Sequence, residues 1–119
     1  MVNRRPPTGD MKILLPDGFE VTSEREGSQM VIRVVGEIDL ATAPHLQRHI
    51  DAAQADDVSS VVLDIDGVTF IDSTGVRLVI TAQSHARAAR QDFALRRVPS
   101  HIRRLLALIG VADRFRITD

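Results

Sequence analysis

The chain has 119 residues, of which 44% are hydrophobic and 26% charged, a balance typical of one globular domain with a single core. Its formal net charge is −1 and its basic residues are scattered along the chain, which argues against binding to nucleic acid. Cysteine is absent, which excludes disulfides and thiolate chemistry, and no apolar run approaches the roughly 18 residues that a membrane-spanning helix needs.

The N-terminal residues are expected to form a flexible leader over 1–17, with the folded domain over 18–119. Residues 1–10 are polar, include Pro6 and Pro7, and lack the apolar segment of a signal peptide. Together with the absence of cysteine, this favours a protein of the reducing cytoplasm.

Two strands open the domain. Apolar and polar residues alternate from Phe19 to Ser23 and again from Met30 to Ile38, as in strands with one buried face. The turn signal at 26–28 leaves only a short connection, which predicts an antiparallel hairpin.

Alternating helices and strands follow. We expect a helix over 43–55, with Ala43, Leu46, Ile50 and Ala53 inward, and then a strand over 59–65 that is apolar on both faces. Residues 66–71 are expected to form a loop that leads into a long helix from Ser73 to about Arg90. The inward stripe predicted for that helix is Gly75, Leu78, Val79, Ala82, Ala86 and Ala89.

The C-terminal part predicts a strand over 93–98, a helix from Pro99 to a stop at Gly110, and a short strand at 115–117. The inward residues of that helix are expected to be Ile102, Leu105, Leu106 and Ile109. The element order β-β-α-β-α-β-α-β predicts an α/β fold with a mixed sheet, mostly parallel after the first hairpin.

The segment 64–75 runs from a central strand into a helix N-terminus, where α/β sheets commonly place function. Either Asp72 or Ser73 can cap that helix. The free N–H groups and the helix dipole favour an anion, so a hydroxyl at Ser73 is chemically suited to carry phosphate. A plain N-cap role for Ser73 is the alternative.

One stripe of the same helix is a candidate partner-binding face. It consists of Ser73, Val76, Arg77, Ile80 and Ser84 and is offset from the inward stripe. Val76 and Ile80 would be apolar anchors with Arg77 between them. The alternative is that Val76 and Ile80 only widen the buried face.

Three motifs carry a resemblance to a known family. They are residues 61–78 with the Asp-Ser-Thr-Gly core, the earlier Gly36-Glu37-Ile38-Asp39, and the helix and turn over 103–111. In this order they resemble the STAS domain family, specifically the bacterial anti-sigma factor antagonists. The resemblance covers about residues 18–118.

The resemblance implies a phosphorylation-controlled switch that is not an enzyme and carries no cofactor. Such proteins bind an anti-sigma factor, typically a serine kinase, and thereby free a sigma factor. The kinase phosphorylates the serine that matches Ser73, and a phosphatase reverses this. Asp39, Asp72 and Thr74 match supporting positions around the phosphosite, whereas Arg77 stands where some members have glycine, which affects partner choice.

The same residues leave other functions open. The protein could instead be a STAS scaffold or accessory module in a stress-signalling or transport assembly, with Ser73 never phosphorylated. Asp39, Asp64, Asp66 and Asp72 could gather at strand ends as a divalent-metal receiver site, but the acidic pair and late lysine of receivers are missing. His45 and His49 have metal-compatible i, i+4 spacing, although an exposed helix face explains them as well.

Overall fold

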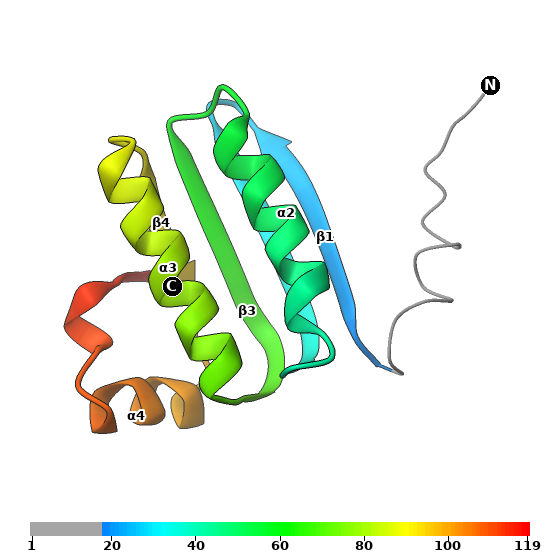
Figure 1. Cartoon of the computed structure of the whole chain (residues 1–119), viewed down its shortest axis with the longest axis vertical. Helices are drawn as coiled ribbons and strands as arrows, with labels where there is room; N and C mark the ends of the chain where they lie inside the picture. The colour runs from blue at the N-terminus through cyan, green and yellow to red at the C-terminus, as the bar shows by residue number, and fades with distance from the viewer. Residues whose placement is uncertain (1–17) are drawn as a thin grey trace.

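The computed structural model describes residues 18–119 and shows a five-stranded mixed sheet with three α-helices (Figure 1). The leader predicted for residues 1–17 lies outside the described residues. The elements in chain order are β1 Glu20–Glu26, β2 Gln29–Ile38, α2 Ala43–Ala55, β3 Ser60–Ile71, α3 Ser73–Ala88, β4 Asp92–Arg96, α4 Ser100–Leu108, the 3-10 turn η1 Ala112–Arg114 and β5 Arg116–Thr118.

The strands lie side by side in the order in which they occur along the chain, β1-β2-β3-β4-β5. The first pair is antiparallel and the other three pairs are parallel, which confirms the predicted mixed sheet. The hairpin between β1 and β2 turns through Gly27, whose φ of +65° is a left-handed conformation that glycine adopts without strain.

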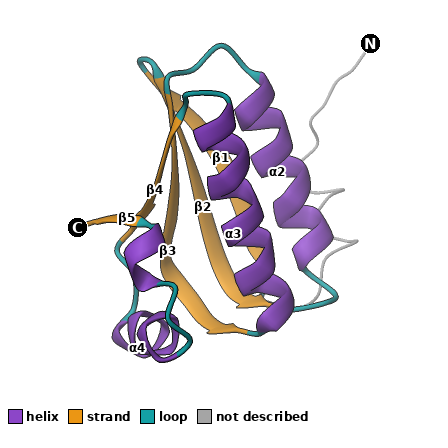
Figure 2. Cartoon of the chain, turned by 60° about the vertical axis from the view of Figure 1, so that its left-hand side comes forward, coloured by secondary structure: helices purple, strands orange, loops and turns teal. Residues whose placement is uncertain are grey.

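Helices α2 and α3 cover the same face of the sheet, while α4 lies beyond its lower end in the view of Figure 2. The bounds predicted for α2 are confirmed, and its predicted stripe of Ala43, Leu46, Ile50 and Ala53 is buried. The core lies between this helical layer and the sheet, where Ile32, Leu63 and Leu95 are almost fully buried. Each such side chain contributes about 1.5–3 kcal/mol by leaving water.

Strand β3 is longer than predicted. Residues 66–71, expected to form a loop, continue the strand to Ile71 and remain paired with β2. The pairing continues through two register shifts, between Arg33 and Val35 and between Gly36 and Glu37. The shifts also break the alternation of buried and exposed side chains, which is why the sequence pattern indicated a loop.

Two residues predicted to face inward are exposed. Helix α3 ends at Ala88, so Ala89 lies in its C-terminal cap, at the start of the turn that connects α3 to β4, and is exposed. Ile109 is likewise the C-cap of α4 and remains 49% exposed. In both helices the apolar periodicity continues in the sequence for one residue beyond the last turn.

Candidate functional site

Ser73 is the first residue of α3, two positions after the end of β3, and its side chain is exposed. Asp72 is the N-cap: its backbone is extended and its Oδ1 accepts a hydrogen bond of 3.1 Å from the Gly75 N–H. Of the two capping residues that the sequence allows, the structure therefore selects Asp72. The hydroxyl of Ser73 lies at the helix tip and does not cap the helix.

Gly75 allows α3 to begin close to the sheet. A Cβ at this position would lie 2.6 Å from Cγ1 of Ile71 and 2.8 Å from Cγ2 of Ile38, distances that real Cβ atoms essentially never show. The N-terminal turn of α3 thus packs against the last residues of β2 and β3, which fixes where Ser73 emerges.

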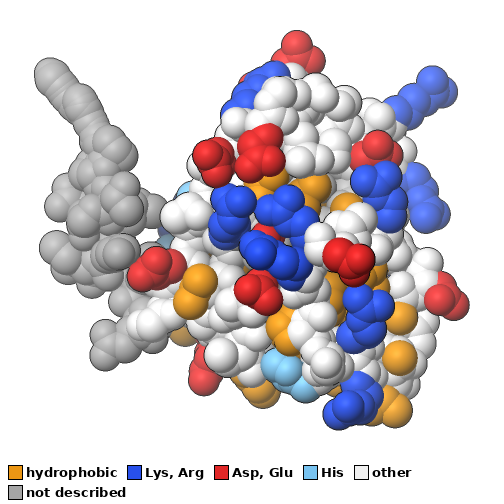
Figure 3. Space-filling view, turned by 180° about the vertical axis from the view of Figure 1, so that it is seen from behind, with side chains coloured by type: hydrophobic (Ala, Val, Ile, Leu, Met, Phe, Trp, Pro, Cys, Tyr) orange, Lys and Arg blue, Asp and Glu red, His pale blue; other side chains and the backbone are white. Residues whose placement is uncertain are grey.

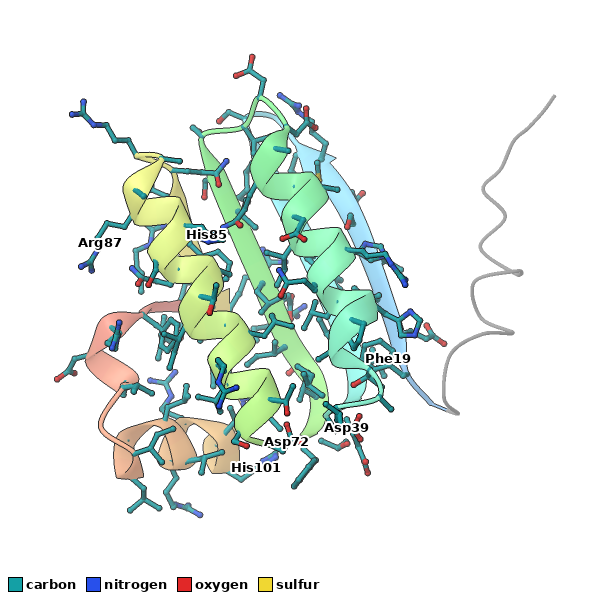
Figure 4. The ribbon with its side chains drawn as sticks, in the orientation of Figure 1. Phe19, Asp39, Asp72, His85, Arg87 and His101 are labelled. Carbon is teal, nitrogen blue, oxygen red and sulfur yellow. The ribbon has the colours of Figure 1, made fainter. Side chains whose placement is uncertain are left out.

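Asp39 shapes the neighbouring turn between β2 and α2. Its Oδ1 accepts hydrogen bonds from the N–H groups of Ala41 at 3.0 Å and Thr42 at 3.1 Å. The two turns are joined by a 3.1 Å hydrogen bond from the Asp72 N–H to the Ile38 carbonyl, and Figure 4 shows Asp39 and Asp72 at the same end of the sheet. Asp39 therefore stabilises the backbone next to the Ser73 turn.

An apolar groove of about 380 Å³, the α3–α4 groove, lies on one side of Ser73. Ser73, Asp72 and Arg77 contribute to its wall. Its apolar lining comes from Ile71, Val76, Ile80, Leu105 and Ile109.

A second apolar groove, the α2–α3 groove, lies on the other side of the α3 N-terminus and has a volume of about 360 Å³. Thr74 lines this groove and not the first one, whereas Arg77 lines both. Its apolar lining comes from Leu40, Ala43, Pro44 and Leu78. The side of α3 that carries the exposed Ser73 and Arg77 therefore lies between the two apolar grooves.

The structure assigns different surroundings to the residues of the predicted partner-binding stripe. Val76 is 7% exposed and belongs to the core, and Ile80 is half-buried against it, so both present only an edge to the α3–α4 groove. Arg77 and Ser84 are exposed, but Ser84 lies outside both grooves. Sequence reasoning missed Leu40, which is 76% exposed beside the Asp39 turn.

Asp64 does not join Asp39 and Asp72. Because β3 runs on to Ile71, Asp64 lies inside the strand, on the face opposite the helices, and is 2% exposed. Arg96 and Arg97 donate hydrogen bonds to its Oδ2, and Figure 3 shows arginine side chains gathered on this face with Asp and Glu among them. Burial raises the pKa of Asp64, but hydrogen bonds from Arg97, the Asp66 N–H and Arg96 outweigh it and hold that pKa below its ordinary value.

The two histidines of α2 have separate contacts. His49 Nδ1 lies 2.7 Å from the Ser23 hydroxyl of β1, and His45 Nδ1 lies 3.3 Å from the Arg48 guanidinium. Burial, helped by the charges of Arg48 and His45, lowers the pKa of His49. Among residues 18–119, no group of three or more His, Asp or Glu side chains is placed to hold a metal ion.

None of the helices within the described part of the chain combines the length and apolar character needed to cross a membrane. The structure brings together the exposed Ser73, its capping neighbour Asp72, the Asp39 turn and the two grooves at one end of the sheet.

Comparison with known proteins bears on this arrangement. The family model described as "Mlab, STAS domain" matches residues 21–118. The anti-sigma-F factor antagonist RsfB of Mycobacterium tuberculosis is 31% identical over 102 residues, which cover 86% of this chain and 83% of RsfB.

Solved structures with the same fold include an anti-sigma factor antagonist from Mycobacterium paratuberculosis, with a TM-score of 0.77, 28% identity and 87% of each chain covered. The phosphorylated form of the Bacillus cell fate determinant SpoIIAA also superimposes, with a TM-score of 0.65, 20% identity, 85% of this chain and 91% of SpoIIAA covered. The match to the family model covers all the strands and helices described above except Glu20, the first residue of β1, so the chain belongs to the STAS domain family.

Proposed function

We propose that this protein is an anti-sigma factor antagonist whose binding to an anti-sigma factor is switched off by phosphorylation of Ser73. In the unphosphorylated form it binds an anti-sigma factor with serine kinase activity in the cytoplasm, and the sigma factor held by that protein is released. The protein is the substrate of the kinase and is not itself an enzyme. The names of RsfB and of the Mycobacterium paratuberculosis structure support this class of partner.

The observation that carries the proposal is the exposed hydroxyl of Ser73 at the tip of a helix capped by another residue. Because Asp72 supplies the cap, modifying Ser73 leaves that hydrogen bond intact. The first N–H groups of α3 and the positive end of its dipole tolerate an added anion. The domain therefore keeps its fold in both states.

The kinase step transfers the γ-phosphoryl group of ATP to Ser73. A bond forms between Oγ and phosphorus, the bond from phosphorus to the β–γ bridging oxygen breaks, ADP leaves, and a base on the kinase takes the hydroxyl proton. A phosphatase reverses the switch when water attacks the phosphorus and inorganic phosphate leaves.

The new charge acts on whatever is docked over the grooves. Phosphorylation adds about −1.5 to −2 charge at pH 7. Ser73 lines the α3–α4 groove among apolar side chains, so a partner seated there would have to desolvate this dianion beside the Asp72 carboxylate. That cost weakens binding without any change in the shape of the domain.

Binding of Ser73 variants to the anti-sigma factor tests the proposal. The partner is first captured with Ser73→Ala as bait, and its affinity is then measured by calorimetry. Ser73→Ala should bind within about twofold of the wild type, because the hydroxyl only rims the groove. Ser73→Glu should bind at least about tenfold more weakly, since it leaves a carboxylate in a desolvated interface.

Ser84 is the matched control, being an exposed serine on the same helix but outside both grooves. Ser84→Glu should bind like the wild type. With the captured kinase and ATP, mass spectrometry should find phosphate on the wild type and none on Ser73→Ala. Equal affinities for Ser73→Glu and Ser84→Glu, or transfer to Thr74 in the Ser73→Ala variant, would contradict the proposal.

A further inference from the structure

A polar cleft of about 560 Å³ lies at the end of α3 remote from Ser73. Four arginines line it: Arg87 from the last turn of α3, Arg90 from the turn that follows, Arg114 from η1 and Arg116 from β5. In Figure 4, Arg87 lies at the opposite end of α3 from Asp72. At 1.5 Å per residue, the helix separates Ser73 from Arg87 by about 21 Å.

These four arginines are unpaired. Within residues 18–119, Arg25, Arg33, Arg96 and Arg97 make the ion pairs of the molecule, and no ion pair or side-chain hydrogen bond involves the cleft arginines. Two aspartates, Asp92 and Asp113, also line the cleft, so four positive and two negative charges leave it at +2. The whole chain has a net charge of −1, so positive charge is concentrated here.

Arg90 occupies a position that favours glycine. It follows the Ala89 cap with φ of +57°, and the turn is closed by hydrogen bonds from the Gln91 N–H to the Ala86 carbonyl and from the Arg90 N–H to the Arg87 carbonyl. The same turn after α4 uses Gly110, with φ of +79°. A side chain in this conformation costs about 1–2 kcal/mol, so Arg90 lies at this position against its own backbone preference.

We propose that this cleft binds a small anion that carries two or more phosphate groups. Unpaired guanidinium groups present planar pairs of N–H donors that match phosphate oxygens, and four of them exceed what a single phosphate needs. The cleft offers no exposed aromatic side chain, since its Phe93 and Phe115 are 6% and 8% exposed, so recognition is of the phosphates and not of a ring. Its volume is that of a small-molecule site.

Pyrophosphate is the probe, titrated into the full chain by calorimetry in 50 mM salt. The wild type should bind pyrophosphate more tightly than orthophosphate or sulfate. Arg87→Ala and Arg116→Ala should each weaken pyrophosphate binding about 5- to 20-fold, because each removes a charged donor pair. The control is Arg48, an exposed arginine of α2 outside the cleft. Arg48→Ala should leave the affinity for pyrophosphate unchanged.

Arg90→Gly separates ligand binding from folding. It should weaken pyrophosphate binding by a similar factor while raising the thermal unfolding midpoint, because glycine relieves the left-handed backbone. A variant that is more stable but binds less cannot be explained by misfolding.

Three outcomes would overturn the inference: no preference for pyrophosphate over sulfate, an equal loss in Arg48→Ala, or tighter binding of a hexaglutamate peptide than of pyrophosphate. The last would show a surface for acidic protein segments. None of these results bears on Ser73, because the two sites lie at opposite ends of α3.

Discussion

Asp72 and Ser73 are adjacent residues with different tasks. The Asp72 carboxylate closes the first turn of α3, and the Ser73 hydroxyl stands free beside it. This division was open in the sequence, since both residue types are good N-caps. The backbone decides it, because only Asp72 has the extended φ and ψ that an N-cap requires.

Substitutions at Asp72 should separate its hydrogen bond from its charge. Asp72→Ala should lower the free energy of unfolding by about 1 kcal/mol, because the Gly75 N–H loses its acceptor. Asp72→Asn should stay within about 0.5 kcal/mol of the wild type, since an amide oxygen caps almost as well. Urea unfolding measures both, and an equal loss in the two variants would show that charge, not capping, is what Asp72 contributes.

The residues around Ser73 could be predicted because they form one contiguous segment. The end of the strand, the capping residue, the hydroxyl and the start of the helix all fall within residues 64–75, so the sequence itself brings them together. Asp64 shows the limit of this reasoning. Its partners Arg96 and Arg97 are 32 and 33 residues further along, and only the pairing of β3 with β4 brings them to it.

At the level of elements, strong periodicity was a reliable guide and interrupted periodicity was not. Helix α2 was predicted at its observed bounds, because its apolar residues keep helical spacing from the first turn to the last. The second half of β3 was missed because Asp66, Thr69 and Phe70 are all exposed around two register shifts. Its partner strand, and not its own pattern, holds it in the sheet.

The fit of α3 onto the sheet should depend on Gly75. Gly75→Ala should lower the free energy of unfolding by about 1–3 kcal/mol, because the new methyl group would overlap Ile71 and Ile38. It should also weaken partner binding by displacing the helix tip. Thr74→Ala, at the adjacent half-buried position, is the control and should cost less. A Gly75→Ala variant as stable as the wild type would show that the helix can move outward freely.

At the scale of the whole molecule, stability should fall with acidification in two stages. The pKa of His49 is lowered in the folded protein, so on acidification the unfolded chain takes up a proton at His49 before the folded protein does. The contribution of His49 to stability is therefore full above about pH 6.5 and declines as the pH falls through the folded-state pKa. The pKa of Asp64 is lowered too, so its contribution is full above about pH 3.8 and is lost below that.

Urea unfolding between pH 8 and 3 tests this order. His49→Gln should flatten the stage below pH 6.5, and Asp64→Asn should flatten the one below pH 3.8. Asp64→Asn should also be less stable at pH 7 by about 1–3 kcal/mol, because Arg96 and Arg97 lose a charged acceptor. A wild type that gains stability from pH 7.5 to 5.5 would contradict the assignment to His49.

The arginine cleft also belongs to this scale. Its residues come from the end of α3, from η1 and from β5, and no local pattern joins them. Scattered charges in the sequence suggested no basic region, yet the fold gathers four arginines around one hollow.

The spatial order of the strands follows the order of synthesis. Each strand after the first is added to an edge that already exists, and no strand has to be inserted between two others. A ribosome that releases the chain from its N-terminus would therefore present the strands in the order in which they pair, so that growth of the sheet can keep pace with translation.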